Sequence, residues 1–154
     1  MIEPIETEES GRASSPDVSA RIYLDSSALA KLYVPETESE MLDAFLLGRR
    51  GLLISELAIT EVLSAVSRRK REKLLRAELA NEIRDALLKD ADSGSLHRVD
   101  LSPAVHREAE YLLLATESVS LRTRDALHIA LALSGAATHI LTFDRCISFF
   151  LTLQ

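Results

Sequence analysis

The chain has 154 residues, 47% of them hydrophobic, which predicts a single domain with a core of its own. A single cysteine, Cys146, excludes an internal disulfide. Because the sequence has neither a secretory leader nor an apolar stretch long enough to cross a bilayer, we expect a cytoplasmic protein with no membrane partner. The net charge of −6 argues against nucleic-acid binding through overall positive charge, and the aromatic content of 5% argues against binding by base stacking.

The first 20 residues differ in composition from the rest of the chain. They are rich in Glu, Ser and Pro, and their five acidic residues against one arginine account for four of the six net negative charges. We interpret residues 1–20 as a disordered or weakly ordered acidic tail and residues 21–154 as one domain. The domain itself is close to neutral, so its charge does not exclude RNA as a partner.

Short apolar runs alternate with longer helical patterns along the domain. The predicted elements are, in chain order, a strand over 21–25, helices over 26–34 and 38–47, a strand over 52–54, helices over 56–69 and 76–91, a strand over 96–99, helices from 103 to about 117 and over 124–133, and a strand over 139–141. Pro35, Ser55, Pro103 and Gly135 mark helix ends. Short strands separated by helices predict an α/β fold, with a mostly parallel sheet covered by helices on both faces.

Four acidic residues occupy positions that such a sheet would bring together. Asp25 follows the first predicted strand, and Asp144 comes just after the last one. Asp125 falls in the opening turn of its helix, and Glu61 lies inside a helix among apolar neighbours. Each acid alone has a structural explanation as a helix cap, a turn residue or a solvated side chain. As a set they are expected to converge, because ligands of open parallel sheets bind at the carboxyl ends of the strands.

Converging carboxylates would repel one another in a partly buried cleft. A divalent cation would remove this repulsion. Oxygen donors without a nearby Cys or His pattern favour Mg²⁺ or Mn²⁺ over zinc. The sequence therefore predicts a magnesium or manganese site.

The segments around these acids resemble the four acidic motifs of PIN-domain nucleases. They are YLDSSALAKLY (23–33), ELAITEVLSAV (56–66), LRTRDALHIALA (121–132) and LTFDR (141–145). They stand in the family order, at compatible separations, and the resemblance is closest to the VapC toxins of prokaryotic toxin–antitoxin pairs. It implies a three-layer α/β/α PIN-like fold and an endoribonuclease that depends on Mg²⁺ or Mn²⁺. It also implies a homodimer and inhibition by a cognate VapB-like antitoxin.

The resemblance also assigns roles to individual residues. The implied catalytic and metal-binding acids are Asp25, Glu61, Asp125 and Asp144. Of these, Glu61 and Asp125 would bind the metal directly or through water. Ser27 and Thr142 match the hydroxyl positions that support such a site. The expected chemistry is hydrolysis of an RNA phosphodiester by a metal-activated water. Family members often continue into a final edge strand, whereas here residues 149–153 are expected to form either a shortened strand or a helix remnant.

Basic side chains near the acids are candidates for contact with RNA. The predicted RNA-contacting residues are Arg122, Arg124, Arg145, Arg68 and Arg69. The first three flank the acids and are expected to contact phosphate or balance charge. The last two belong to a basic run that either meets the RNA backbone or is a solvated helix end. Lys31 is expected on the exposed face of its helix. His128 stands one helical turn after Asp125, so a role near the site stays open, but a packed core histidine is the favoured interpretation.

Other functions were weighed against this hypothesis. A haloacid-dehalogenase-type phosphatase needs a second Asp where Ser27 stands, and a response-regulator receiver needs an acidic pair after its first strand and a late lysine. DNA and flap nucleases of similar type have longer chains with extra DNA-clamping elements, for which 154 residues leave little room. The alternatives that stay open are a non-catalytic PIN-fold module that binds RNA or protein, and a housekeeping RNA-processing nuclease.

Overall fold

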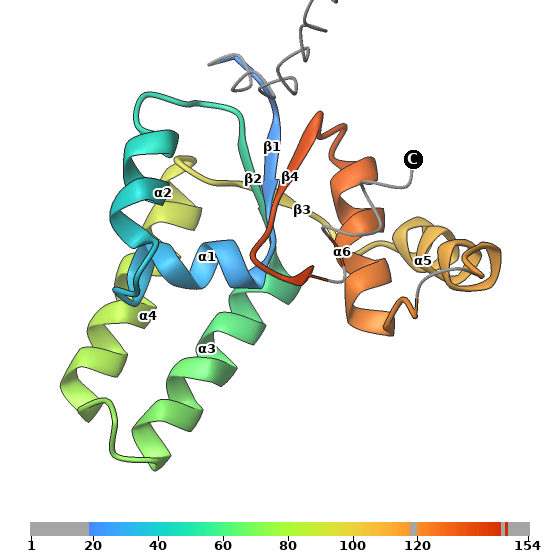
Figure 1. Cartoon of the computed structure of the whole chain (residues 1–154). Coiled ribbons are helices and arrows are strands. Elements are labelled where there is room, and N and C mark those ends of the chain that lie inside the picture. The colour runs from blue at the N-terminus through green and yellow to red at the C-terminus, as the bar shows by residue number, and fades with distance from the viewer. Residues whose placement is uncertain (1–18, 118–119, 146, 148–154) are drawn as a thin grey trace, which may run out of the picture.

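The computed structural model describes residues 19–117, 120–145 and 147 of the chain. The residues predicted as a tail therefore lie almost entirely outside the described part, as do Cys146 and residues 149–153. A four-stranded sheet with the order β3-β2-β1-β4 forms the centre of the fold, and every described pairing is parallel (Figure 1). The strands are β1 (Ile22–Leu24), β2 (Leu52–Ser55), β3 (His97–Val99) and β4 (His139–Leu141).

Six helices of the described chain cover the two faces of this sheet. They are α1 (Ser26–Tyr33), α2 (Ser39–Leu46), α3 (Glu56–Arg71), α4 (Ala77–Ser93), α5 (Pro103–Ala115) and α6 (Thr123–Ser134). In Figure 1, α1 to α4 lie on one side of the sheet, and α5 and α6 lie on the other. The predicted three-layer α/β/α fold is confirmed.

The two central strands, β1 and β2, are buried on both faces, so the sheet separates two apolar cores. Ile22 and Leu24 of β1 pack toward the helices α1 to α4, whereas Tyr23 between them packs toward α5 and α6. This alternation follows from the two-residue period of a strand. Strands that are apolar on both faces are typical of a covered parallel sheet.

Local sequence signals explain where the helices begin and end. Ser55 is the last residue of β2 and accepts a hydrogen bond from the backbone N–H of Ala58, so it caps α3 as expected. Pro103 occupies the first turn of α5. Gly94 ends α4 with a φ of +82°, a left-handed conformation that glycine adopts without strain. No helix in the described ranges has the length and apolar character needed to span a membrane.

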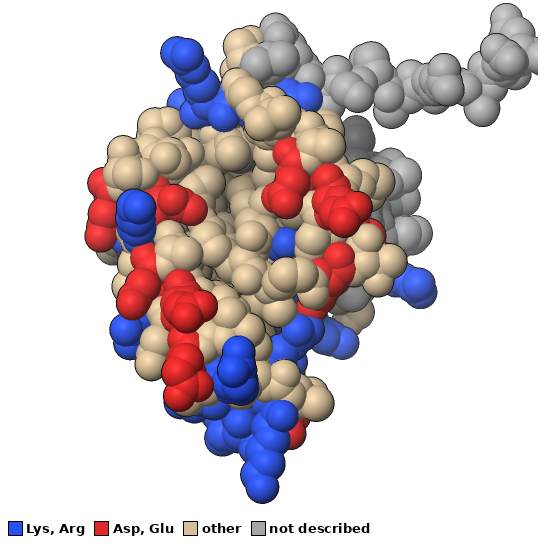
Figure 2. All heavy atoms as spheres, turned by 90° about the vertical axis from the view of Figure 1, so that its left-hand side faces the viewer, with Lys and Arg blue, Asp and Glu red and all other residues tan. Residues whose placement is uncertain are grey.

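The helices α3 and α4 extend beyond the sheet and meet in a turn. The last turn of α3 carries four consecutive basic residues, 68–71. Figure 2 shows Lys and Arg side chains gathered at the lower end of the molecule, where this turn lies. The predicted basic run is therefore a surface feature at the end of a helix.

Candidate active site

Asp25 follows β1 directly and is the N-cap residue of α1. It is only 2% exposed. Its Oδ1 accepts hydrogen bonds from the Ser27 hydroxyl at 2.6 Å and from the backbone N–H of Ala28 at 2.9 Å. Its Oδ2 accepts a hydrogen bond from the Thr142 hydroxyl at 2.5 Å. Three donors thus fix this buried carboxylate at the carboxyl end of the sheet.

The same two hydroxyls connect Asp25 to the segment after β4. The backbone N–H of Phe143 donates to Ser27 Oγ at 2.8 Å, and the backbone N–H of Asp144 donates to Thr142 Oγ1 at 2.9 Å. These contacts form because β1 and β4 are parallel neighbours whose carboxyl ends coincide. Ser27 and Thr142 therefore hold the first and last predicted acids beside each other.

Arg124 brings the remaining acids into the same cluster. Its Nη2 lies 3.1 Å from Asp144 Oδ2, and its Nε lies 3.6 Å from Glu61 Oε1 and 3.5 Å from Asp125 Oδ1. Partial burial acts to lower the pKa of Arg124, but the negative charges of Glu61, Asp125 and Asp144 outweigh it and raise that pKa. One guanidinium thus neutralises part of the charge of three carboxylates contributed by α3, α6 and the segment after β4.

Asp125 is the most deeply buried acid of the cluster, at 1% exposure. Neither of its carboxylate oxygens accepts a hydrogen bond from any described residue. Burying a carboxylate without hydrogen bonds is costly, and native proteins rarely leave such a group without a compensating ion or water. The Asp125 carboxylate therefore has the environment expected of a ligand for a cation.

Glu61 lies on α3 with a side chain that is 20% exposed. Burial acts to raise the pKa of Glu61, but hydrogen bonds from His128 and Ser26 outweigh it, so the pKa of this carboxyl lies below its usual value. These hydrogen bonds therefore favour the ionised form of Glu61, which adds negative charge to the cluster.

His128 contacts Glu61 of the acidic cluster, and Tyr23 contacts His128; sequence reasoning missed Tyr23 and favoured a packing role for His128. His128 is 1% exposed, as a packed histidine would be, but its Nε2 lies 2.6 Å from Glu61 Oε2 and its Nδ1 lies 2.8 Å from Tyr23 Oη. Tyr23 Oη also lies 2.8 Å from Ser55 Oγ. Two signals point to these residues: a buried tyrosine hydroxyl needs a partner, and His128 stands one helical turn after Asp125.

A cleft of about 520 Å³ opens beside the acids, between α1 and α3. Glu61, Arg124 and Asp144 line it at one end. Basic residues line it farther along the two helices, and they are Lys31, Arg68 and Arg69. The cleft can therefore present both acidic and basic groups to one ligand.

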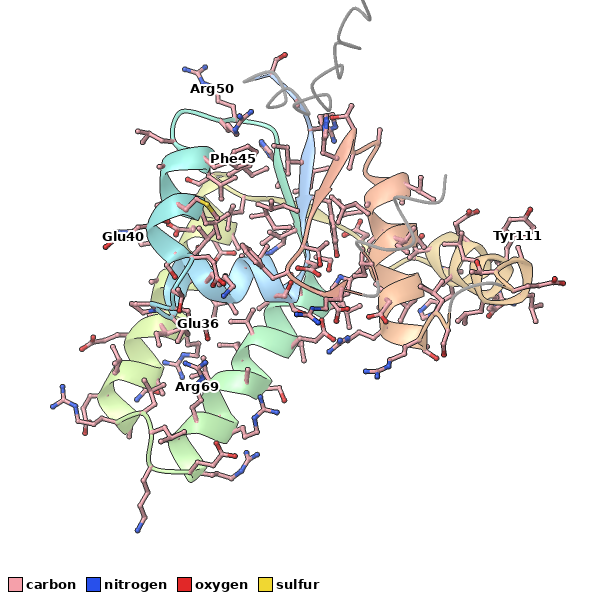
Figure 3. All side chains as sticks on the ribbon, in the orientation of Figure 1. Glu36, Glu40, Phe45, Arg50, Arg69 and Tyr111 are labelled. Carbon is pink, nitrogen blue, oxygen red and sulfur yellow. The ribbon has the colours of Figure 1, made fainter. Side chains whose placement is uncertain are left out.

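Two of these basic residues are already paired with a single acid. Glu36, from the segment between α1 and α2, accepts a hydrogen bond from Lys31 at 2.9 Å and another from Arg69 (Figure 3). Lys31 also donates to Glu38 at 2.6 Å, and hydrogen bonds to Glu38 and Glu36 raise the pKa of Lys31. The Lys31 side chain is only 11% exposed, so the expectation that it lies on an exposed helix face is wrong.

The other predicted basic residues lie beside the acids without pairing to them. Arg122, at the N-cap position of α6, and Arg145 are exposed. Within the described ranges, neither forms an ion pair with Asp25, Glu61 or the other acids of the cluster.

In the part of the chain that the structure describes, no three His, Cys, Asp or Glu side chains are grouped as a ready-made metal cage. The four carboxylates nevertheless lie at one end of the sheet, and Arg124 supplies the positive charge among them. Their oxygen atoms are the donors that Mg²⁺ and Mn²⁺ prefer. Both oxygens of Asp125 lack a hydrogen bond, and Arg124 at 3.5 Å is the ion-pair partner of Oδ1, so this donor set fits a divalent cation.

Comparison with known proteins agrees with the fold and the motifs. The PIN-domain family model matches residues 22–148, so the chain belongs to the PIN-domain family. The crystal structure of Mycobacterium tuberculosis VapC20, described as a toxin that cleaves the sarcin–ricin loop, has a TM-score of 0.67 and 15% sequence identity to the chain. The likeness covers 84% of this chain and 94% of that one, and at this identity it shows a common fold. No curated protein sequence matches the chain.

Proposed function

We propose that the chain is a metal-dependent endoribonuclease that hydrolyses RNA phosphodiester bonds, and that it is the toxin of a VapBC-type toxin–antitoxin pair. The observation that carries this proposal is the meeting of Asp25, Glu61, Asp125 and Asp144 at the carboxyl end of one parallel sheet, beside an open cleft. Membership of the PIN-domain family and the likeness to VapC20 support it.

The four carboxylates are the residues that would hold Mg²⁺ or Mn²⁺. The oxygens of Asp125 accept no hydrogen bond from the described chain, and Asp144 and Glu61 line the cleft. Asp25 Oδ2 accepts one hydrogen bond and can accept a further contact, so the hydrogen bonds of Asp25 do not exclude metal binding. When bound, the cation supplies an activated water and stabilises the charge that develops on the phosphate.

The remaining groups of the site orient the acids and the substrate. Ser27 and Thr142 hold Asp25 against the segment that carries Asp144. Arg124 lines the cleft as well as contacting the acids, so it can meet a phosphate of the RNA backbone. Arg68 lies farther along the cleft, where a neighbouring phosphate would pass.

We further propose a cognate VapB-like antitoxin as protein partner, a homodimer as the assembled state and the cytoplasm as the location. These proposals follow from the likeness to a VapC toxin and from the absence of a membrane-spanning helix in the described residues.

The substitution Asp25→Asn tests this function most directly. Asparagine keeps the N-cap role and the size of the side chain, whereas alanine would remove the cap and cost about 0.5–2 kcal/mol of stability. Cleavage of a mixed RNA substrate in Mg²⁺ or Mn²⁺ is expected to fall by about 10²-fold or more, because the site loses one of its negative charges. Addition of EDTA to the wild type is expected to stop cleavage.

Asp100→Asn is the matched control, since Asp100 also follows a strand but is exposed at the far edge of the sheet. It should cleave RNA at the wild-type rate. Wild-type cleavage by Asp25→Asn, or cleavage that persists in EDTA, contradicts the proposal. RNA binding without cleavage by the wild type would instead identify a non-catalytic binding module.

A further inference from the structure

A continuous line of buried hydrogen bonds runs from β2 to the acidic cluster. Ser55 Oγ contacts Tyr23 Oη at 2.8 Å, Tyr23 Oη contacts His128 Nδ1 at 2.8 Å, and His128 Nε2 contacts Glu61 at 2.6 Å. Ser55, Tyr23 and His128 are each at most 1% exposed. The line therefore crosses the interior and ends on a carboxylate that faces the cleft.

The hydrogen atoms along this line have one arrangement that satisfies every group. The backbone N–H of Ala58 donates to Ser55 Oγ at 3.1 Å, which leaves the Ser55 hydroxyl proton for Tyr23 Oη. Tyr23 then donates to His128 Nδ1, and this nitrogen accepts only when Nε2 carries the ring proton. The line thus selects the tautomer in which His128 Nε2–H donates to Glu61.

The placement of His128 has a further consequence. Asp125 and His128 are three residues apart on α6 and therefore share a face of that helix. The same helix thus contributes one acid of the cluster and the group that holds a second acid, Glu61, on α3. A histidine that served packing alone would not need its Nε2 on a cleft-lining carboxylate.

We propose that His128 and Tyr23 are positioning residues that hold the Glu61 carboxylate in the orientation required to bind a divalent cation. The inference rests on the proposed function, because it concerns Glu61 as a group that binds the cation. Hydrogen-bond partners behind a metal ligand fix its direction, and their loss typically weakens metal affinity or activity by about 10–100-fold.

The test uses two substitutions in the full-length chain. His128→Gln keeps a side-chain N–H but removes the ring that links Tyr23 to Glu61, and Tyr23→Phe removes only the hydroxyl. Isothermal titration with Mn²⁺ alone is expected to show about 10–100-fold weaker binding for His128→Gln, and a smaller loss for Tyr23→Phe. RNA cleavage should lose kcat while KM for RNA stays within about twofold, because the substituted groups do not contact RNA.

The double variant separates a shared role from two independent ones. Because both residues act through Glu61, Tyr23→Phe should weaken Mn²⁺ binding much less in the His128→Gln background than in the wild type. Fully additive losses contradict the proposed line of hydrogen bonds.

Tyr33→Phe is the matched control. It also removes a tyrosine hydroxyl, in this case one from a half-buried residue that donates to Asp90 of α4 at 2.8 Å and contacts none of the four acids. It should therefore leave Mn²⁺ affinity unchanged. Thermal unfolding identifies the variants that fold, and if His128→Gln does not fold, Tyr23→Phe decides the question.

Two outcomes overturn the positioning role. One is a folded His128→Gln or Tyr23→Phe chain that binds Mn²⁺ as tightly as the wild type, and the other is an equal loss of affinity in Tyr33→Phe. A wild-type chain that neither binds Mn²⁺ nor cleaves RNA contradicts the proposed function itself. Failure of the inference and failure of the function therefore give different results.

Discussion

Replacing Arg124 by glutamine removes the guanidinium that three carboxylates of the site share. In the metal-free chain, the charges of Glu61, Asp125 and Asp144 then repel one another without the positive charge that Arg124 supplied. In this variant a divalent cation would no longer compete with the arginine for the carboxylates or be repelled by its charge. Arg124→Gln should therefore lower stability in EDTA and raise the affinity for Mn²⁺.

The size of both effects follows from the ion-pair geometry. At separations of 3.1–3.6 Å, two unit charges in water attract by about 1.2 kcal/mol. The Arg124 side chain is 47% exposed, so screening and side-chain entropy reduce each pair to about 0.2–1 kcal/mol. Loss of three pairs should lower the free energy of unfolding by about 1–2 kcal/mol. The same free energy corresponds to an increase of about 5–30-fold in Mn²⁺ affinity.

Urea unfolding in EDTA measures the first effect, and isothermal titration with Mn²⁺ measures the second, both at low and constant ionic strength because salt screens exposed pairs. Arg122→Gln is the control, since Arg122 begins the same helix but pairs with none of these acids within the described ranges. A folded Arg124→Gln chain whose Mn²⁺ affinity is unchanged or reduced would refute the view that the guanidinium and the cation compete.

Two further substitutions test the cleft and the sheet. Glu36→Gln should free Arg69 and weaken the hold on Lys31, so that RNA binds more tightly and the slope of log affinity against log salt steepens by about one. Fluorescence anisotropy, with the inactive Asp25→Asn substitution also present, measures both the affinity and the slope. An unchanged slope would contradict the view that Glu36 holds a basic side chain away from RNA. Gly51→Ala would place a Cβ 2.6 Å from the Ala20 backbone carbonyl oxygen, so the free energy of unfolding should fall by about 1–3 kcal/mol. Urea titration measures this loss. A variant as stable as the wild type would show that the backbone shifts to make room for the methyl group.

The fold was predictable because its boundaries carry local chemical signals. The Asp25 and Ser55 side chains cap helices directly after strands, and Pro103 marks the first turn of α5. The central strands β1 and β2 are buried on both faces, which is the pattern of a covered parallel sheet. The expected convergence of the acids followed from the same logic, since parallel strands end at a common edge.

The partners of individual side chains were not predictable in the same way. His128 lies 67 residues from Glu61 and 105 from Tyr23, and these contacts depend on how α3 and α6 are rotated against opposite faces of the sheet. Lys31 was expected at the surface because lysine usually is, but Glu36 and Glu38 from the following segment cover it. The long-range contacts of His128 leave no periodic trace in the sequence.

The two cores described above determine when the acidic cluster can form during folding. Glu61 is carried by α3, which packs into the core on one face of the sheet, whereas Asp125 is carried by α6, which packs into the core on the other. A folding intermediate with only one helical layer docked lacks part of the cluster. During synthesis, α6 and β4 must leave the ribosome before the four acids can come together, so the cluster is completed only when most of the domain has been made.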